Sequence, residues 1–213
     1  MKKIISDDVN SRLDALIKKT EKSTGAQIVF AVIRRSDSYT ELPWKAFTLG
    51  ASITGLLVYF LNINDWSLQL TKLFIIAIIM AGGAFLSLLT VLLPGFAKWF
   101  LSKERADVEV NQYAKSLFLE HELFATRKRT GILFLVSLFE RKVVILPDKG
   151  IRSGLTEEAM QSIILTMKTF LKKNDLYMAF ETVLEQLCSI LTNEDMSSGE
   201  NELPDQIIEE KGV

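Results

Sequence analysis

The sequence predicts an α/β protein with a small central mixed sheet flanked by helices and a two-helix transmembrane hairpin inserted in the first crossover. Three observations support this class. Two long stretches, residues 46–64 and 73–97, carry no charged residue. Short apolar runs typical of buried strands lie on both sides of this pair. Amphipathic helix patterns accompany these runs, as expected where helices cover a sheet.

The first predicted elements are a helix and a strand. Ser6 is a suitable N-cap, and the helix is expected to stop near Thr24 and Gly25. Apolar residues repeat at helical spacing between these ends, at Val9, Leu13, Leu16 and Ile17. Residues 26–33 then form a predicted strand.

The two uncharged stretches are long enough to cross a bilayer, which needs roughly 20 apolar residues as helix. Aromatic rings that favour the headgroup zone lie near their ends, at Trp44, Tyr59, Trp66 and Trp99. Pro94 and Gly95 fall near the exit of the second span, where a kink is tolerable. A buried helical hairpin in a soluble fold is the alternative.

Basic residues predict the orientation of the spans. They lie before the first span and after the second, whereas the connection has none before Lys72 at its far end; the flanking ones are Arg34, Arg35, Lys45, Lys98, Lys103 and Arg105. The positive-inside rule therefore places both termini in the cytoplasm. The N-terminal "MKKII" runs into acidic residues without the apolar core of a signal peptide.

Small residues predict close packing in the hairpin. They recur four residues apart in each span, at Ala51 and Gly55 and at Gly83 and Ser87. Such pairs let helices approach closely, so we expect the spans to pack on each other, on a partner or in a homo-oligomer.

"RTGILFLVSLFERKVVILPDKG", residues 129–150, predicts two more strands. Residues 131–139 are too short to span a bilayer and read as a strand buried on both faces. Residues 143–146 are its expected neighbour after a turn near Glu140 and Arg141. Glu-Arg is a poor two-residue hairpin turn, so we expect the loop to include Phe139 or Lys142 as well.

Helical periodicity returns on either side of these strands. One helix carries Val110, Ala114, Leu117, Phe118 and His121; a second carries Met160, Ile163, Ile164, Met167 and Leu171; a third, capped by Asp175, carries Leu176, Phe180, Val183, Leu184, Leu187 and Leu191.

One strand and one helix cannot bury a core, so the parts flanking the hairpin are expected to join. The predicted division is 1–43 and 101–193 in one α/β domain, 44–100 in the hairpin, and 194–213 as an acidic, mostly mobile tail with an ordered "NELPD".

Composition and motifs exclude several function classes. The formal net charge is −1, which gives no case for nucleic-acid binding. Cys188 is single, which excludes an internal disulfide. The sequence has no Cys-x5-Arg loop, Asp-x-Asp motif, glycine-rich phosphate loop or histidine cluster. His121 is expected to be a core or rim residue rather than a ligand.

Four segments resemble the TPM domain family, which is named for a thylakoid-lumen photosystem II repair protein and a nematode acetylcholine-receptor modulator. These are "TGAQIVFAVI", "VNQYAKSLFLEHEL", "TRKRTGILFLVSLFERKVVILPDKGI" and "NELPD". The resemblance implies a central sheet flanked by helices. It also implies a phosphatase-like activity and divalent-cation binding, calcium in particular, or a role beside large membrane assemblies. The inserted hairpin and the cytoplasmic side depart from the secreted or outward-facing pattern of many members.

Two carboxylates stand at loop positions where sites tend to form, Asp37 after the first strand and Asp148 after the third. A right-handed crossover makes the first two strands parallel, and the short link makes the third antiparallel. Asp37 and Asp148 then lie at opposite edges and cannot share a metal. Each is a separate candidate metal ligand, and a turn that satisfies its own backbone is the alternative for Asp148.

The Asp148 edge is the preferred functional surface, with Arg127, Lys128, Arg129 and Thr130 as the residues expected to meet a partner or an anionic ligand. The sequence therefore predicts an integral membrane protein with a cytoplasmic interaction or assembly module for membrane complexes. A metal-dependent phosphatase-like hydrolase is the alternative.

Overall fold

The structure, a computed structural model, describes residues 7–63, 71–152, 154–173, 175–191 and 207–212. The chain divides into two compact units. Unit 1 comprises Met1–Asp37 and Asp107–Val213, and unit 2 comprises Ser38–Ala106. Unit 2 is thus inserted in the sequence of unit 1.

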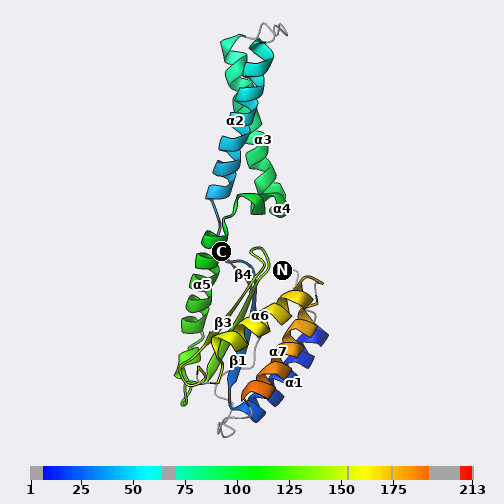
Figure 1. Cartoon of the computed structure of the whole chain (residues 1–213), viewed down its shortest axis with the longest axis vertical. Coiled ribbons are helices and arrows are strands. Elements are labelled where there is room, and N and C mark those ends of the chain that lie inside the picture. Colours follow the sequence, from blue (N-terminus) through cyan, green and yellow to red (C-terminus); the bar gives the residue numbers. More distant parts are fainter. Residues whose placement is uncertain (1–6, 64–70, 153, 174, 192–206, 213) are drawn as a thin grey trace. The chain divides into compact units, whose positions relative to one another are not determined.

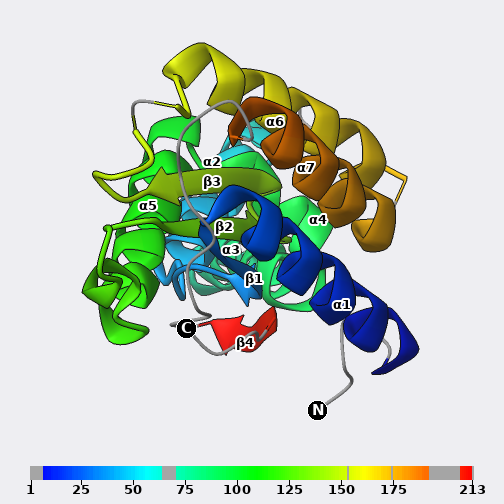
Figure 2. The same ribbon diagram turned by 90° about the horizontal axis from the view of Figure 1, so that it is seen from below.

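A four-stranded mixed sheet with the order β3-β2-β1-β4 forms the centre of unit 1 (Figures 1 and 2). β1 pairs in parallel with both β2 and β4, and β2 pairs antiparallel with β3. The predicted directions of the first three strands are therefore confirmed. The strands are β1 (Gln27–Arg35), β2 (Gly131–Ser137), β3 (Lys142–Pro147) and β4 (Ile207–Gly212).

Helices cover both faces of this sheet. α1 (Asp7–Thr24), α6 (Glu157–Leu171) and α7 (Leu176–Leu191) lie on one face, and α5 (Lys103–Glu120) runs along the other (Figure 2). Successive side chains of β1 alternate between the two layers, so Phe30 packs with α7 and Ala31 with α5. Burial on both faces explains why β1 and β2 read as continuous apolar runs.

The predicted helix ends are found. Gly25 adopts φ 69°, a left-handed conformation that ends α1 at low steric cost. Asp175 caps α7, because its Oδ1 accepts from the Met178 N–H at 3.0 Å. Ser6, the predicted cap of α1, lies outside the described residues.

The connection between β2 and β3 is a four-residue turn. Ser137 pairs with Lys142, so residues 138–141 form the loop. The loop includes Phe139, as predicted, and Arg141 takes the positive φ of 54°. Glu-Arg alone could not supply such a turn at low steric cost.

β4 is the main departure from the prediction. The tail was expected to be mostly mobile, and this is wrong for residues 207–212, which pair with β1 from Phe30 to Arg35. Ile207 joins the core on the α7 face, and Ile208 packs on the α5 face. Two apolar residues beside three charged ones give too weak a local pattern to predict an edge strand. The predicted "NELPD" lies outside the described residues.

The side chain of Glu21 accepts a hydrogen bond from the edge of β1 at a point that β4 does not reach. The pairing with β4 begins at Phe30, and the Gln27 N–H is directed to Thr130 on the other side. The Ile28 N–H therefore faces away from β2, and Glu21 Oε1 accepts from it at 2.7 Å. A backbone donor at a buried position needs such a partner, so a buried acidic residue of α1 substitutes for a strand.

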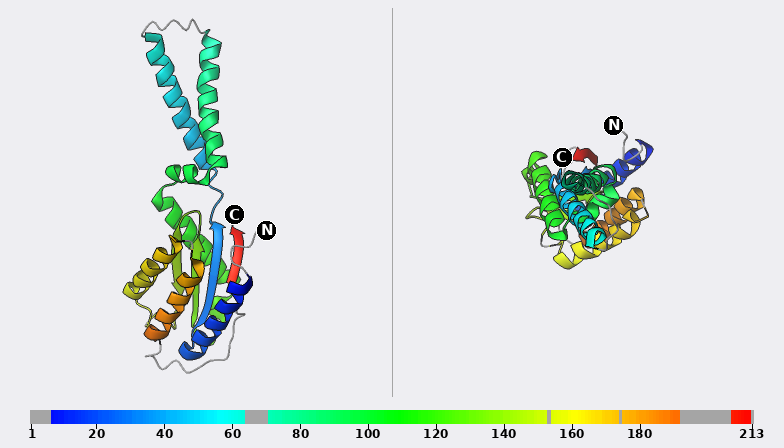
Figure 3. Two further views of the ribbon diagram at one scale, coloured as in Figure 1. Left: turned by 90° about the vertical axis from the view of Figure 1, so that its right-hand side faces the viewer. Right: turned by 90° about the horizontal axis from the view of Figure 1, so that it is seen from above.

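Unit 2 contains two long apolar helices, α2 (Glu41–Ile63) and α3 (Lys72–Leu92), which run beside each other in opposite directions (Figure 3). Both are long and apolar enough to cross a membrane, over Glu41–Leu61 and Lys72–Leu92. Most of their large apolar side chains are exposed. α2 starts earlier than the predicted span.

The second helix is shorter than predicted. The uncharged stretch to Ala97 was expected to be one span, but α3 ends at Leu92 and a separate short helix, α4 (Pro94–Ala97), follows. Leu93 between them is extended, with φ −119° and ψ 95°. Steric contact with the ring of Pro94 disfavours helix at the preceding residue, so the kink is a complete break.

Glycines bring α2 and α3 into close contact. A Cβ on Gly50 would lie 2.6 Å from the Gly82 carbonyl oxygen, and one on Gly83 would lie 2.8 Å from the Phe47 ring. Gly83 therefore packs as predicted. Gly55 does not take part in this contact, because a Cβ there would make an ordinary 3.8 Å contact with Ile79.

Candidate functional site

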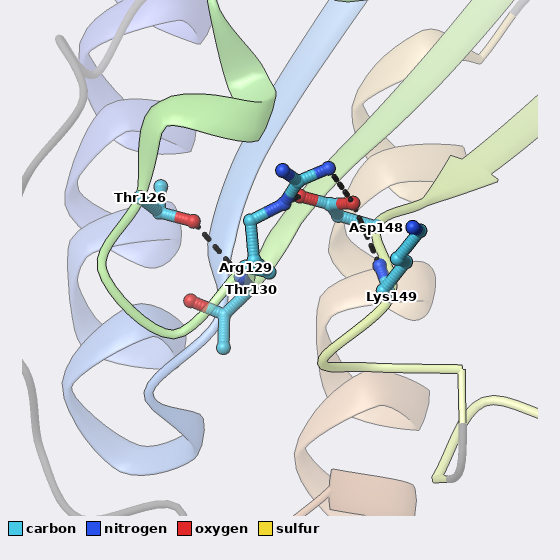
Figure 4. Close-up of polar contacts among 5 residues, drawn as sticks. All are labelled: Thr126, Arg129, Thr130, Asp148 and Lys149. Atoms are coloured by element: carbon cyan, nitrogen blue, oxygen red, sulfur yellow. Dashed lines mark hydrogen bonds and ion pairs between the residues drawn. The ribbon is translucent and has the colours of Figure 1, made fainter.

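An ion pair joins the two loops at the start of β2 and the end of β3 (Figure 4). Arg129 Nε donates to Asp148 Oδ2 at 2.6 Å, and Arg129 Nη2 donates to Oδ1 at 3.0 Å. This two-pronged geometry matches the fork of a guanidinium to both oxygens of one carboxylate. The pair lies within the surface that the sequence predicted to be functional.

The backbone holds both partners in place. Arg129 adopts φ 59°, and its N–H donates to the Thr126 carbonyl at 3.0 Å. The next N–H, of Thr130, donates to Thr126 Oγ1 at 2.9 Å (Figure 4). Asp148 is fixed to β2, because its N–H donates to the Gly131 carbonyl at 2.8 Å.

Gly150 allows the two loops to approach. Its N–H donates to the Arg129 carbonyl at 2.9 Å. A Cβ on Gly150 would collide with the Lys128 carbonyl oxygen and lie 2.8 Å from that of Arg129. The glycine of "DKG" is thus required by a close contact with the loop before β2, which a turn motif alone does not reveal.

The surroundings keep Asp148 ionised. The residue is only 5% exposed, and this burial opposes charge on the carboxylate. Hydrogen bonds from the Arg129 side chain and from the Lys149 N–H outweigh the burial and hold the pKa of Asp148 below its ordinary value. The hydrogen bond from the Arg129 side chain to Asp148 also raises the pKa of Arg129.

This arrangement does not fit a divalent cation. Both Asp148 oxygens already accept from a cationic side chain, and calcium needs six to eight oxygen ligands. Within the described ranges, no three His, Cys, Asp or Glu side chains are grouped to hold a metal. A metal ion would have to displace the guanidinium, so the positive charge at this position is supplied by the chain itself.

The predicted partner residues differ in exposure. Arg127, Lys128 and Arg129 are exposed, whereas Thr130 is only 5% exposed. Thr130 therefore shapes the loop through its backbone, whose carbonyl accepts from the Gln27 N–H at 2.9 Å. The exposed part of the predicted surface is basic.

Asp37 lies at the other end of the strands, as predicted. It follows the carboxyl end of β1, whereas Asp148 is bonded to Gly131 at the amino end of the parallel β2. His121 follows α5 and is partly buried, which agrees with a rim position.

A second polar cluster near Asp37 was missed from the sequence. Glu140 Oε1 accepts from the Ser36 N–H at 3.0 Å and from Ser36 Oγ at 2.7 Å, and Oε2 accepts from Ser137 Oγ. Beside it, the Arg35 guanidinium lies over the Phe139 ring, 4.8 Å from its centroid. Carboxyl ends of parallel strands are where open α/β sheets bind ligands. A serine at each strand end was the available signal.

The Glu140 cluster joins the ends of β1 and β2. Its carboxylate is held by three donors from two segments, so it is rigidly placed at that edge. The cluster therefore offers a carboxyl group in a fixed position, with no histidine or cysteine among its members.

The comparisons with known proteins agree with this architecture. The TPM domain model matches residues 99–190, a stretch that begins after α3 and includes α5, β2, β3, α6 and α7. The NMR structure of the BA42 protein from the psychrophilic bacterium Bizionia argentinensis is similar, with a TM-score of 0.59 and 12% identity over 99% of this chain and 98% of that chain. At this identity the likeness shows the fold alone. No curated protein matches the sequence. Residues 99–190 are thus similar to the TPM domain, and the fold of the chain is similar to that of BA42.

Proposed function

We propose that this protein belongs to the TPM domain family, is anchored in a membrane by α2 and α3, and uses its unit 1 as a cytoplasmic interaction or assembly module for membrane protein complexes. The Arg129–Asp148 ion pair is the observation that favours this role over metal-dependent hydrolysis. A hydrolase of that kind needs carboxylate oxygens open to the ion, with a nucleophile or base beside it. Here both oxygens of Asp148 are bonded to Arg129.

The hairpin supports the anchoring part of the proposal. Its exposed residues include large apolar side chains along both helices, among them Leu56, Phe60, Phe74, Ile76 and Phe85. Such a surface is stable in lipid and unfavourable in water. The distribution of basic residues around the spans supports the cytoplasmic side.

The basic loop supports the interaction part. Arg127 and Lys128 are exposed, and the loop that carries them is tied down by hydrogen bonds to Thr126 and Gly150. Because the backbone of this loop is already fixed, a partner that binds it does not have to pay for ordering the loop backbone. Its charge suits an acidic surface of a partner protein.

Affinity capture tests the module directly. The tagged full-length chain, solubilised from membranes in mild detergent, is compared with Arg127→Glu/Lys128→Glu. The matched control is Lys172→Glu/Lys173→Glu, which makes the same charge change at two exposed basic residues elsewhere in the chain. We expect a defined membrane complex with the wild type and the control, and its loss with the loop variant.

An activity assay tests the hydrolase alternative. The purified wild type is incubated with phosphomonoesters and Mg²⁺ or Ca²⁺, beside Asp148→Asn and Glu140→Gln. We expect no cation-dependent turnover above background. Turnover that either substitution abolishes without a change in thermal stability would favour the hydrolase and overturn the proposal.

A further inference from the structure

The short segment after α3 changes direction and forms a foot. We use "the foot" for α4 (Pro94–Ala97) and η1 (Lys98–Phe100) together. α4 runs across the axis of α3 instead of continuing it (Figures 1 and 3). The extended backbone of Leu93 before Pro94 produces this turn. The sequence "PGFAKWF" therefore cannot extend the span.

Three aromatic rings gather on the foot. The Phe96 ring centroid lies 5.8 Å from that of Trp99 and 5.4 Å from that of Phe100. Ala97 is 2% exposed and faces inward, whereas Trp99 is 83% exposed. Indole combines a large apolar face with one N–H donor and is enriched where an apolar phase meets water.

The beginning of α2 lies beside the foot. Lys45 Nζ donates to the Phe100 carbonyl at 3.4 Å. Its neighbour Trp44 is 71% exposed. Arg105 Nε lies 3.8 Å from Glu41 Oε1, which ties the first turn of α5 to the first turn of α2. One end of the helix pair therefore carries exposed tryptophans and basic residues together.

We propose that the foot lies in the headgroup layer of the membrane that α2 and α3 cross, with Trp99 inserted at the boundary and Lys98 and Lys103 near anionic phospholipid headgroups. This inference rests on the anchoring part of the proposed function. It assigns an anionic-lipid site to residues that end the hairpin.

Continuity with the lipid-facing surface selects lipid over a protein partner. The last residues of α3 and the break after it are exposed and apolar: Val91, Leu92 and Leu93 are 66%, 63% and 52% exposed. This surface runs directly into Pro94 and the aromatic rings. Residues 94–106 then contain three basic residues and one acidic residue, a balance that an anionic leaflet attracts.

Depth-dependent quenching in lipid nanodiscs tests the position of Trp99. The full-length chain with Trp44→Phe and Trp66→Phe keeps Trp99 as its single tryptophan. The discs contain lipids brominated either near the headgroup or deep in the acyl chain, and iodide serves as the aqueous quencher. We expect blue-shifted emission, strong quenching by the shallow bromolipid and weak quenching by iodide.

Two probes in a tryptophan-free background, in which Trp99 is also replaced by Phe, calibrate this result. Phe85→Trp reports whether α3 is inserted, because Phe85 is 61% exposed on that helix. Leu119→Trp reports an exposed site of α5, since Leu119 is 62% exposed. Deep bromolipid should quench the first probe, and iodide should quench the second.

The probes separate failure of the foot from failure of the anchor. If deep lipid quenches Phe85→Trp but iodide quenches Trp99 as strongly as Leu119→Trp, the foot proposal is wrong and the anchor remains. Protection of Trp99 from iodide without bromolipid quenching would place protein over it and would also overturn the proposal. Absence of lipid quenching at Phe85→Trp would overturn the anchor itself.

Charge removal tests the lipid class. Protection of Trp99 is measured in neutral discs and in discs with phosphatidylglycerol, for Lys98→Gln and for the matched control Lys115→Gln, an exposed lysine of α5. We expect anionic lipid to increase the protection of Trp99. Lys98→Gln should lower the preference for anionic over neutral discs roughly fivefold, which is the contribution of one lysine near an anionic surface. Equal protection in both discs, or an equal loss with Lys115→Gln, would overturn the assignment to anionic lipid.

Discussion

At the residue scale, the partners of the Arg129–Asp148 pair are not equivalent. Asp148 is 5% exposed, whereas the Arg129 side chain is 47% exposed. A guanidinium that loses its partner can therefore be hydrated in place, but a buried carboxylate that loses its partner cannot. The two single substitutions should have different consequences.

We expect Arg129→Met to destabilise unit 1 more than Asp148→Asn does. Asp148→Asn weakens the hydrogen bonds to the Arg129 guanidinium and should lower the free energy of unfolding by about 1–2 kcal/mol. Arg129→Met leaves the carboxylate buried without its cationic partner, and it keeps a non-glycine residue at φ 59°. The double variant should be more stable than Arg129→Met alone. Thermal unfolding of the detergent-solubilised protein measures this order, and the reverse order would contradict the burial argument.

The contribution of Asp148 should depend on pH in the acidic range. Its folded-state pKa lies below the ordinary value, so the carboxylate stabilises the fold at pH values above its unfolded pKa of about 3.9. This stability is lost as the pH falls through the lower folded-state pKa. The gap in stability between wild type and Asp148→Asn should therefore be full at pH 7 and shrink below about pH 4. A constant gap over this range would contradict the pairing.

At the element scale, the α2–α3 contact depends on glycines at specific positions. Gly50 approaches the backbone of Gly82 and Gly83, whereas Gly55 has ordinary space around it. Small residues recur along both helices in the sequence, and their spacing alone does not show which of them face the other helix. Only the structure shows that Gly50 lies in the contact and that Gly55 does not.

We expect Gly50→Leu to separate α2 and α3 and Gly55→Leu to be tolerated. Overpacking of a close contact costs about 1–3 kcal/mol, and the two variants add the same apolar side chain to the same helix. The loss of helix contact is measured as the SDS concentration that disrupts the pair in detergent. Similar resistance to SDS in both variants would show that the glycine contact does not hold the pair.

Within unit 1, β4 is held by its pairing with β1, by the packing of Ile207 and Ile208, and by a hydrogen bond from α5. Tyr113 Oη of α5 donates to Glu210 Oε2 at 2.5 Å. Burial, followed by this hydrogen bond, raises the pKa of Tyr113, so the hydroxyl stays protonated and remains a donor throughout the physiological range. The bond therefore links the last strand to the helix layer that covers the sheet.

Tyr113→Phe should loosen β4 without unfolding the sheet. It removes one hydrogen bond, which should lower the stability of this contact by about 1 kcal/mol. The substitution should therefore speed amide exchange of residues 207–212. Tyr177→Phe is the matched control, because Tyr177 donates to Glu181 within α7 and has no contact of this kind with β4. Hydrogen exchange with mass spectrometry compares the two, and equal exchange in both would show that Tyr113 does not hold the strand.

At the scale of the whole molecule, the charge pattern makes a testable statement about topology. In a Cys188→Ser background, a cysteine at Asn64 or Ser67 should react with an impermeant thiol reagent in intact cells, and one at Ser198 should not. The reason is the concentration of basic residues on the two outer flanks of the hairpin. Labelling at Ser198 alone would invert the topology.

The predicted fold depended on strong local patterns. The continuous apolar run from Gly131 to Phe139 and the helical spacing of Phe180, Val183 and Leu187 each indicate one type of element. Chain connectivity then fixes the relative directions of β1, β2 and β3, because a right-handed crossover and a short link leave few choices. For the same reason the separation of Asp37 and Asp148 could be predicted.

The sequence by itself thus determined the main helices of unit 1, the first three strands with their relative directions, and the two apolar helices, because periodicity and charge are local properties of a chain. Tertiary structure decided three further points: the pairing of Ile207 with β1, the joining of Ser36 and Ser137 by Glu140, and the bond of Arg129 to Asp148. In each case the partners are separated in the chain or meet through a turn whose geometry depends on its neighbours. Such contacts depend on how strands and loops are placed in space, and no local pattern carries that information.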